Sequence, residues 1–333
     1  MFSVLSNRLN LHIENLSSLG QVFEITKERL DAALRRHPEL SEKLQITIGY
    51  DGEGFSEAIK TADVLFGWDF ERKNLEQTAP NLRWIQLQGA GINHLLPLDW
   101  VPPNIQLTNS RGVHGARACE YLIMSVLALN NRLPEMMTNQ RQKSWVPVHN
   151  DTISGKTLLI YGVGNIGGGV ATLAKHFGMR VLGIRRTDKP HKDVDEMHQP
   201  EALKALLPES DIVLVTAPHT PKTECVFGEQ EFNLMKQGAG FINYSRADLV
   251  DYDALLLALE AARISAVVDV FQEEPLPESS PLWDAPNLFI TPHSSSNDPK
   301  HHADRSLDLL FDNMKRFIQG DELKNRIDFD QLY

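Results

Sequence analysis

The sequence predicts an α/β protein with two doubly wound parallel sheets that follow one another along the chain. Short apolar runs of strand length alternate with amphipathic segments of helical period over nearly the whole sequence, which is typical of parallel sheets covered by helices. A glycine-rich turn joins one apolar run to a helical pattern within residues 157–177. The length of 333 residues is more than one core usually fills, so we expect two domains.

The first sheet is expected to form from about the first hundred residues, and polar and proline-rich segments at 102–103 and 108–112 mark a crossing between domains. A long helical pattern then runs from residue 113 to about residue 141, and Pro134 should bend or interrupt it. In the first domain the patterns predict strands at 11–13, 44–48, 64–67 and 82–87, with helices at 27–36, 54–62 and 74–79.

The second sheet is expected to begin at residue 157 and to continue the same βα alternation. The charged stretch 187–197 is interpreted as a solvated loop, and a last helix is predicted at about 300–318. The patterns predict strands at 157–161, 181–184, 212–216, 240–244, 265–270 and 287–291, with helices from about 165 to 177 and at 201–206, 229–235 and 252–262.

The composition, 42% hydrophobic and 23% charged, is that of an ordinary globular protein. A net charge of -11 argues against nucleic acid or an anionic membrane as the main partner. No apolar run is long enough to span a bilayer, and the first residues lack the pattern of a signal peptide. Cys119 and Cys225 stand alone, which gives no support to a disulfide framework or a zinc site. We therefore expect a cytoplasmic protein without a bound metal.

The glycine-rich turn reads Gly162-Val163-Gly164-Asn165-Ile166-Gly167. The first glycine allows a tight turn, the second lets the backbone approach a pyrophosphate, and the third lets the helix pack closely on the strand. Backbone amides at Asn165 and Ile166 open the helix, where its dipole favours phosphate. This glycine pattern alone is a weak signal, but the strands expected on both sides provide the context of a dinucleotide-binding unit.

The end of the second strand of this unit indicates the cofactor. An NAD enzyme needs Asp or Glu there to bind the ribose hydroxyls, whereas this chain has Arg185-Arg186-Thr187 and no acid before Asp188. A carboxylate would repel the 2′-phosphate of NADP, and a guanidinium pairs with it. The alternative is that both arginines are merely solvated. The sequence favours NADP over NAD.

Polar side chains follow three later strands: Arg246 in Asn243–Arg246, Glu274 in Asp269–Pro275, and His293 in Thr291–His293. In open α/β sheets, ligands lie at the carboxyl ends of the strands. Each residue alone is more often a surface arginine, a capping acid or a satisfied histidine. Together, beside a dinucleotide turn, they favour a site for proton transfer and anion binding.

With these motifs the sequence resembles the D-isomer-specific 2-hydroxyacid dehydrogenases, and its arginines resemble those of the NADP-type glyoxylate and hydroxypyruvate reductases in that family. The likeness extends from about residue 86 to residue 293. It is carried by the turn 162–167, Phe177-Gly178-Met179, the loop Pro218-His219-Thr220-Pro221-Lys222-Thr223, the three strand-end motifs, Gly89-Ala90-Gly91-Ile92-Asn93 and Ala118-Cys119-Glu120.

The resemblance implies that an NAD(P)-binding Rossmann domain, residues 108–294, is inserted into a flavodoxin-like substrate-binding domain made of residues 1–107 and 295–333. It also implies a homodimer that reduces a small 2-keto acid to the D-2-hydroxy acid. His293 would be the acid/base, oriented by Glu274, and Arg246 would bind and polarise the substrate. The remaining roles would be substrate carboxylate binding by the amides of Ala90 and Gly91, and cofactor binding by Pro218, Thr223 and Asp269.

Three departures from the family pattern bear on the site. Ala247 follows the arginine where glycine is usual, and Asn93 replaces an aspartate in the carboxylate loop. Ser294-Ser295-Ser296 stands where an apolar-glycine sequence is common, so we expect a more polar wall after His293.

Two alternatives remain open at this point. One is a regulatory protein that senses dinucleotide with the same fold, and the other is a phosphonate or formate oxidoreductase of the same family. His301 and His302 could suggest a metal, but no third ligand is suitably spaced. The first eighty residues contain no readable motif, so the sequence does not indicate which 2-keto acid is bound.

Overall fold

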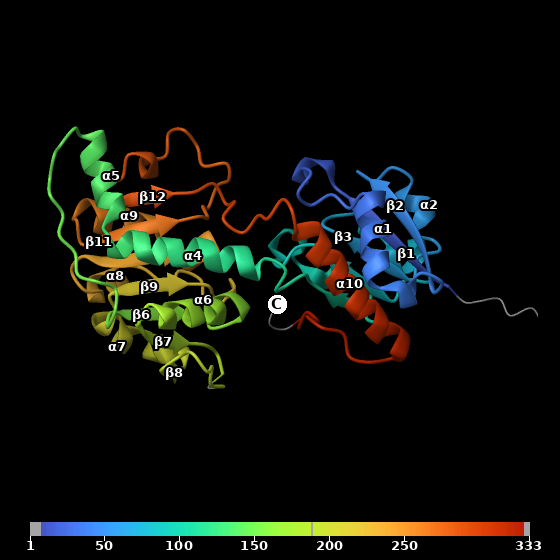
Figure 1. Cartoon of the computed structure of the whole chain (residues 1–333). Coiled ribbons are helices and arrows are strands. Elements are labelled where there is room, and N and C mark those ends of the chain that lie inside the picture. The colour runs from blue at the N-terminus through green and yellow to red at the C-terminus, as the bar shows by residue number, and fades with distance from the viewer. Residues whose placement is uncertain (1–7, 188, 330–333) are drawn as a thin grey trace, which may run out of the picture. The chain divides into compact units, whose positions relative to one another are not determined.

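The computed structural model describes residues 8–187 and 189–329, which form two compact α/β units (Figure 1). Unit 1 combines residues of the segments Met1–His114 and Asn297–Tyr333, and unit 2 is the continuous segment Gly115–Ser296. The boundaries expected from the sequence, after residues 107 and 294, lie slightly earlier along the chain. Two parallel sheets covered by helices confirm the predicted fold class.

Unit 1 contains a five-stranded parallel sheet in the order β2-β1-β3-β4-β5, the flavodoxin-like order. Its central strands alternate: Leu11 and Phe66 face one side, and Leu65 and Ile85 face the other. Helices α1 and α10 cover the first side, and α2 and α3 the second. The elements are β1 (Leu9–Asn15), α1 (Lys27–Arg36), β2 (Leu44–Tyr50), α2 (Phe55–Ala58), β3 (Val64–Gly67), α3 (Leu75–Thr78), β4 (Trp84–Leu87), β5 (Gln106–Thr108) and α10 (His302–Gln319).

Unit 2 contains a seven-stranded sheet in the order β12-β11-β10-β9-β6-β7-β8, with every pairing parallel. Counted from β6, this is the Rossmann order with a seventh strand added at one edge. Its strands are β6 (Thr157–Tyr161), β7 (Arg180–Ile184), β8 (Glu196–His198), β9 (Ile212–Val215), β10 (Ala239–Asn243), β11 (Ile264–Val268) and β12 (Leu288–Ile290).

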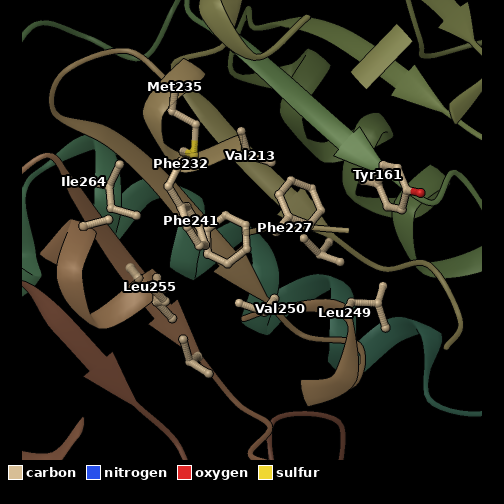
Figure 2. Close-up of a cluster of buried hydrophobic side chains, with 14 of the residues drawn as sticks. Tyr161, Val213, Phe227, Phe232, Met235, Phe241, Leu249, Val250, Leu255 and Ile264 are labelled. Carbon is tan, nitrogen blue, oxygen red and sulfur yellow. The ribbon is translucent and has the colours of Figure 1, made fainter. Parts of the chain in front are cut away.

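Alternate side chains of these strands enter two separate cores. Leu158 and Ile160 pack against α4 and α6, whereas Leu159 and Tyr161 enter the core beneath α7, α8 and α9. In this second core Phe227, Phe232 and Phe241 lie together (Figure 2). The helices of the unit are α4 (Gly115–Asn130), α5 (Leu133–Arg141), α6 (Asn165–His176), α7 (Leu203–Leu206), α8 (Glu229–Leu234) and α9 (Tyr252–Glu260).

The structure refines two predictions and contains one strand that was not predicted. The helix expected from residue 113 is interrupted between α4 and α5, where Arg132 is left-handed and Pro134 enters the first turn of the new helix, as a proline can. The solvated-loop interpretation of 187–197 is wrong at its end, because β8 begins at Glu196. β5 was not expected, since it is short and polar at its start. Short 3-10 helices lie at Ser17–Leu19, Pro38–Leu40, Asn93–Leu95, Leu98–Trp100, Pro200–Ala202, Leu207–Glu209, Ala247–Leu249 and Pro281–Trp283.

Of the helices that the structure describes, none is long and apolar enough to cross a membrane.

Candidate active site

The glycine-rich turn lies between β6 and α6, at the point where the strand order of unit 2 reverses. Gly162 has a φ of +111°, and a Cβ atom there would overlap the backbone nitrogen of Ala217. Its carbonyl oxygen accepts a hydrogen bond of 2.7 Å from the Thr216 hydroxyl. A Cβ on Gly167 would meet that same carbonyl oxygen at 2.5 Å. The turn is therefore packed tightly against the segment that follows β9.

Gly164 differs from these two glycines, because a Cβ atom built there meets nothing within 4 Å. It is the N-cap residue of α6, and no side chain caps the helix. Asn165 and Ile166 begin the helix directly after this open position. An uncapped helix start that faces free space suits a phosphate group, so the turn fits the pyrophosphate of a dinucleotide.

The arginines favoured for cofactor binding follow β7, the neighbour of β6. The carbonyl oxygen of Ile184 accepts a 2.8 Å hydrogen bond from the backbone N–H of Gly162, so Arg185 follows the residue that anchors the turn. Arg185 Nη1 donates to the carbonyl oxygen of Lys189 at 3.3 Å. Arg186 and Thr187 are exposed. Asp188 lies outside the described residues.

The loop between residues 218 and 223 follows β9 and its own side chains hold it together. The Thr223 hydroxyl donates to the carbonyl oxygen of Pro218 at 2.8 Å and accepts from the backbone N–H of Thr220 at 2.8 Å. Ser245 also donates a hydrogen bond to the carbonyl oxygen of Ala217, just before the loop. Thr223 thus has a structural task that the sequence pattern did not reveal.

His293 and Glu274 form the hydrogen-bonded pair expected from their motifs. Nδ1 of His293 lies 2.7 Å from Oε2 of Glu274, and the backbone N–H of Phe271 donates to the other carboxylate oxygen at 2.8 Å. Both side chains are partly accessible, at 43% for the histidine and 35% for the glutamate. Because a carboxylate only accepts, Nδ1 carries the proton in this pair, and Nε2 on the opposite side of the ring can exchange a proton with a ligand.

The backbone at His293 is also unusual, with a φ of +46°. Non-glycine residues rarely adopt this left-handed region, and strain of this kind clusters at functional sites. The N–H of His293 donates to the carbonyl oxygen of Thr291 at 3.1 Å, which fixes the turn after β12. The imidazole is therefore positioned both by its side-chain partner and by its own backbone.

Arg246 follows β10 and is half-buried. Its Nη1 donates to the carbonyl oxygen of Ser245 at 2.7 Å, and Asn243 Nδ2 donates to the carbonyl oxygen of Arg246 at 3.1 Å. Burial lowers the pKa of Arg246, and the negative charge of Glu274 opposes this shift. The result is a partly desolvated guanidinium, which binds an anion more strongly than a fully hydrated one.

Asp269 follows β11 and is 2% exposed. Thr291 Oγ1 donates to its Oδ1 at 2.6 Å, and Ser295 Oγ donates to its Oδ2. Burial raises the pKa of Asp269, while these two hydroxyls and the positive form of His293 act against that rise. The structure thus brings Arg246, Asp269, Glu274 and His293 to the carboxyl ends of the adjacent strands β10, β11 and β12.

Three polar contacts of this region were not predicted. They join Thr216 to Gly162, Tyr121 to Thr291 and Ser295 to Asp269. Tyr121 lies on α4, and its hydroxyl is 2.7 Å from that of Thr291. No local motif reveals such a contact, since the two residues are far apart in sequence. For Ser295, the departure from the usual apolar residue after the histidine was the available signal.

Ala90 and Gly91 belong to unit 1, where they follow β4. Asn109 Nδ2 donates to the carbonyl oxygen of Ala90 at 2.8 Å. The adjoining Gly89 lies so close to the Trp68 ring that a Cβ atom would overlap it. These contacts give the loop a fixed path. Within the described part of the chain, no group of three His, Cys, Asp or Glu side chains is placed to hold a metal ion.

Comparisons with known proteins agree with these observations. The family model described as "D-isomer specific 2-hydroxyacid dehydrogenase, NAD binding domain" matches residues 123–295. A glyoxylate reductase of Thermococcus litoralis is 32% identical over 271 residues, which are 78% of this chain and 81% of that protein. A glyoxylate reductase of Korarchaeum cryptofilum is 31% identical over 255 residues, which are 74% of this chain and 76% of that protein.

Among solved structures, a D-isomer specific 2-hydroxyacid dehydrogenase from Xanthobacter autotrophicus Py2, in complex with NADPH and MES, is similar with a TM-score of 0.83. The two sequences are 27% identical, and the match covers 97% of this chain and 99% of that one. The expected family and NAD(P) cofactor class are confirmed, and so is the expectation of an oxidoreductase. The chain belongs to the D-isomer specific 2-hydroxyacid dehydrogenase family.

Proposed function

We propose that this protein reduces a small 2-keto acid, such as glyoxylate or hydroxypyruvate, to the D-2-hydroxy acid with NADPH. The observation that carries the proposal is the 2.7 Å hydrogen bond between His293 and Glu274 at the carboxyl end of the cofactor-binding sheet. Relatives named glyoxylate reductase support the substrate class. When bound, the cofactor would supply the hydride that the carbonyl carbon of the keto acid requires.

His293 supplies the proton that this reduction also requires. Glu274 binds Nδ1 and stabilises the imidazolium, which leaves Nε2 to donate its proton to the keto oxygen. As the carbonyl carbon gains hydride, its oxygen gains that proton, and the product hydroxyl is formed. The imidazole is then neutral and must regain a proton from solvent, to which its side chain is 43% accessible.

Arg246 is proposed to bind the carboxylate of the keto acid and to polarise its carbonyl group. Its partial burial supports this role, because a desolvated guanidinium stabilises developing negative charge on oxygen more strongly. On unit 1, the backbone amides of Ala90 and Gly91 are proposed to bind the substrate carboxylate. In this assignment unit 1 is the substrate-binding domain and unit 2 the cofactor-binding domain.

The cofactor is assigned to the turn at Gly162, Gly164 and Gly167 and to the helix start at Asn165 and Ile166. Gly164 supports the assignment, because free space adjoins it. The preference for NADP is assigned to the cationic end of β7, where a 2′-phosphate would be attracted. The residues concerned are Arg185, Arg186 and Thr187. Pro218, Thr223 and Asp269 complete the proposed cofactor site, with Asp269 assigned to its nicotinamide end.

Free-cysteine chemistry and exposed apolar side chains support two further proposals. Cys119 and Cys225 form no disulfide, which agrees with a reducing, cytoplasmic location.

We also propose a homodimer formed through α4, α5 and the segment that follows them. The exposed apolar side chains of this region are Met124, Leu133, Met136, Trp145 and Val146.

The test is oxidation of NADPH and NADH with glyoxylate, hydroxypyruvate, pyruvate and phenylpyruvate, followed by loss of nicotinamide absorbance. We expect the native protein to prefer NADPH and one of the smaller acids. His293→Ala should lower kcat by about 10² to 10⁴-fold, the usual contribution of a general acid. The variant should still bind NADPH, because the cofactor is assigned to the glycine turn and the end of β7, whereas His293 is assigned to proton transfer.

His301→Ala is the matched control, because His301 is an exposed histidine of unit 1 that contacts Asp298. Its turnover should equal that of the native protein. Unchanged turnover in His293→Ala would contradict the proposed mechanism. Tight binding of NADPH without turnover of any keto acid would instead favour a dinucleotide-sensing protein.

A further inference from the structure

Asp269 is a buried carboxylate for which the proton transfer above has no use. It is 2% exposed at the end of β11, and the neighbouring strand β10 holds its backbone, since the N–H of Asp269 donates to the carbonyl oxygen of Asn243 at 3.1 Å. An isolated charge at such a depth is costly, so a carboxylate stays ionised there only if donors compensate it. The structure provides those donors from the segment 291–295.

The donors are side-chain hydroxyls and one backbone amide. Thr291, after β12, donates to Oδ1 at 2.6 Å, and Ser295 donates to Oδ2. The backbone N–H of Ser294 also bonds to the carboxylate. Behind Thr291, the hydroxyl of Tyr121 on α4 lies 2.7 Å from Thr291 Oγ1. Both carboxylate oxygens thus have a hydroxyl partner, and one of those partners has a second hydroxyl behind it.

The direction of these hydrogen bonds follows from the number of protons available. An ionised carboxylate only accepts, so Thr291 directs its single hydroxyl proton to Asp269. The Tyr121 hydroxyl must then be the donor in its bond to Thr291. A protonated Asp269 would have to donate to one of its two hydroxyl partners and so reverse that bond. The arrangement Tyr121 to Thr291 to Asp269, with Ser295 on the other oxygen, therefore matches the anion.

The titratable groups that face Asp269 come from four elements. Tyr121 lies on α4, Tyr244 follows β10, Tyr252 lies on α9 and His293 follows β12. Burial raises the pKa of each of the three tyrosines, that of Tyr244 to about 12, so all three are neutral near neutral pH. His293 is the group among these four that can carry a positive charge.

We propose that Ser295 and Tyr121 are positioning residues that hold Asp269 as a fixed anion, and that this anion makes the protein bind NADP+ in preference to NADPH. The inference rests on the proposed function, in which Asp269 belongs to the nicotinamide end of the cofactor site. The nicotinamide ring is cationic in NADP+ and neutral in NADPH. A preorganised negative charge would also stabilise the positive charge that develops there as hydride passes to the keto acid.

The serine segment 294–296 divides its tasks in a way that offers a matched control. Ser295 is 4% exposed and its hydroxyl bonds to Asp269, and Tyr244 has side-chain hydrogen bonds with both Ser295 and Ser296. Ser294 is exposed, and only its backbone N–H bonds to the carboxylate. An alanine at Ser294 keeps that N–H, while an alanine at Ser295 removes a donor.

The experiment measures the dissociation constants of NADP+ and NADPH by quenching of protein fluorescence over a range of pH, without any keto acid. The ratio of the two constants is the readout, because the 2′-phosphate is common to both cofactors and its contribution to the binding free energy cancels in the ratio. In the native protein the preference for NADP+ should fall on acidification as Asp269 becomes protonated. In Asp269→Asn the preference for NADP+ over NADPH should be small. It should not fall with the protonation of residue 269, and any remaining pH dependence should come from His293.

We call the fall in NADP+ preference on acidification the acid step. Ser295→Ala should move this step to a pH higher by about one to two units, since losing a hydrogen bond to the charged carboxylate raises the proton affinity of Asp269 about tenfold to a hundredfold. Tyr121→Phe should move it in the same direction by less, because it acts through Thr291. Ser295→Thr should restore the native curve, and Ser294→Ala should leave it unchanged. The Tyr121 variant provides a second test if Ser295→Ala folds poorly.

An acid step in the same place in Ser295→Ala and Tyr121→Phe would overturn the inference while leaving the proposed function intact. A native protein without a preference for NADP+ at any pH would overturn it as well. Absence of keto-acid turnover by a native protein that binds both cofactors would overturn the proposed function instead, so the two failures are distinguishable.

Discussion

Arg185 and Arg186 stand at the one strand end where an NAD enzyme needs an acid, and charge alone distinguishes the two cofactors there. Arg185→Asp combined with Arg186→Ala should weaken NADPH binding and move the ratio of specificity constants towards NADH by about tenfold or more, because charge-assisted hydrogen bonds to the 2′-phosphate are lost. Steady-state kinetics with both cofactors measure this ratio.

Arg117→Ala, a change on the exposed surface of α4, serves as the control for loss of positive charge. It should leave the cofactor ratio unaltered. If the double change at β7 also left the ratio in place, the 2′-phosphate would have to be held by another part of the protein.

At the scale of single residues, the sequence could predict the partners that belong to motifs. The hydrogen bond between His293 and Glu274 was expected, since each residue ends a recognisable strand motif. The contact of Tyr121 with Thr291 could not be expected. Tyr121 reads as one more apolar position of a helix, and only the packing of α4 on the sheet brings its hydroxyl to the site.

At the scale of elements, the turn between β6 and α6 makes opposite demands on two of its glycines. Gly162→Ala should destabilise unit 2 by about 1–3 kcal/mol, because the new Cβ atom overlaps the Ala217 backbone and φ is +111°. Gly164→Ala should change stability by less than about 0.5 kcal/mol, since its Cβ enters free space. Chemical denaturation measures both values.

Cofactor affinity separates the same two variants in a second way. Gly164→Ala should bind NADPH more weakly although its fold is intact, because the methyl group occupies the space proposed for phosphate. Equal NADPH affinity in Gly164→Ala and the native protein would show that the pyrophosphate does not approach this backbone.

Long, strongly apolar elements were the ones that the sequence could predict. β6 was expected at its observed bounds, because its five residues are all buried and apolar or β-branched. β8 was missed, since its sequence Glu-Met-His has an exposed acid and no apolar run. It is a strand because β7 offers an edge with which it can pair, and an edge is a property of the sheet rather than of the segment.

At the scale of the whole molecule, the exposed apolar residues of α4 and α5 predict association. Light scattering should give twice the chain mass of 37.5 kDa. Met124→Asp together with Met136→Asp should produce a monomer, since the side chains are 45% and 38% exposed and a charge at each would oppose burial in an interface. The matched control is Leu257→Asp on α9, where the leucine is 63% exposed. A native monomer would contradict the proposal.

The composition of unit 1 from two distant segments has a consequence for synthesis on the ribosome. α10 covers the face of the sheet formed by Leu11, Phe66 and Trp84, and its own Leu310 and Phe311 lie in the same core. When residues 1–114 emerge, only α1 can cover that face, and unit 2 is made in full before α10 appears. Unit 2 can therefore complete its fold first. Until α10 is synthesised, the N-terminal segment keeps part of its apolar surface exposed, and such surfaces bind chaperones and promote aggregation.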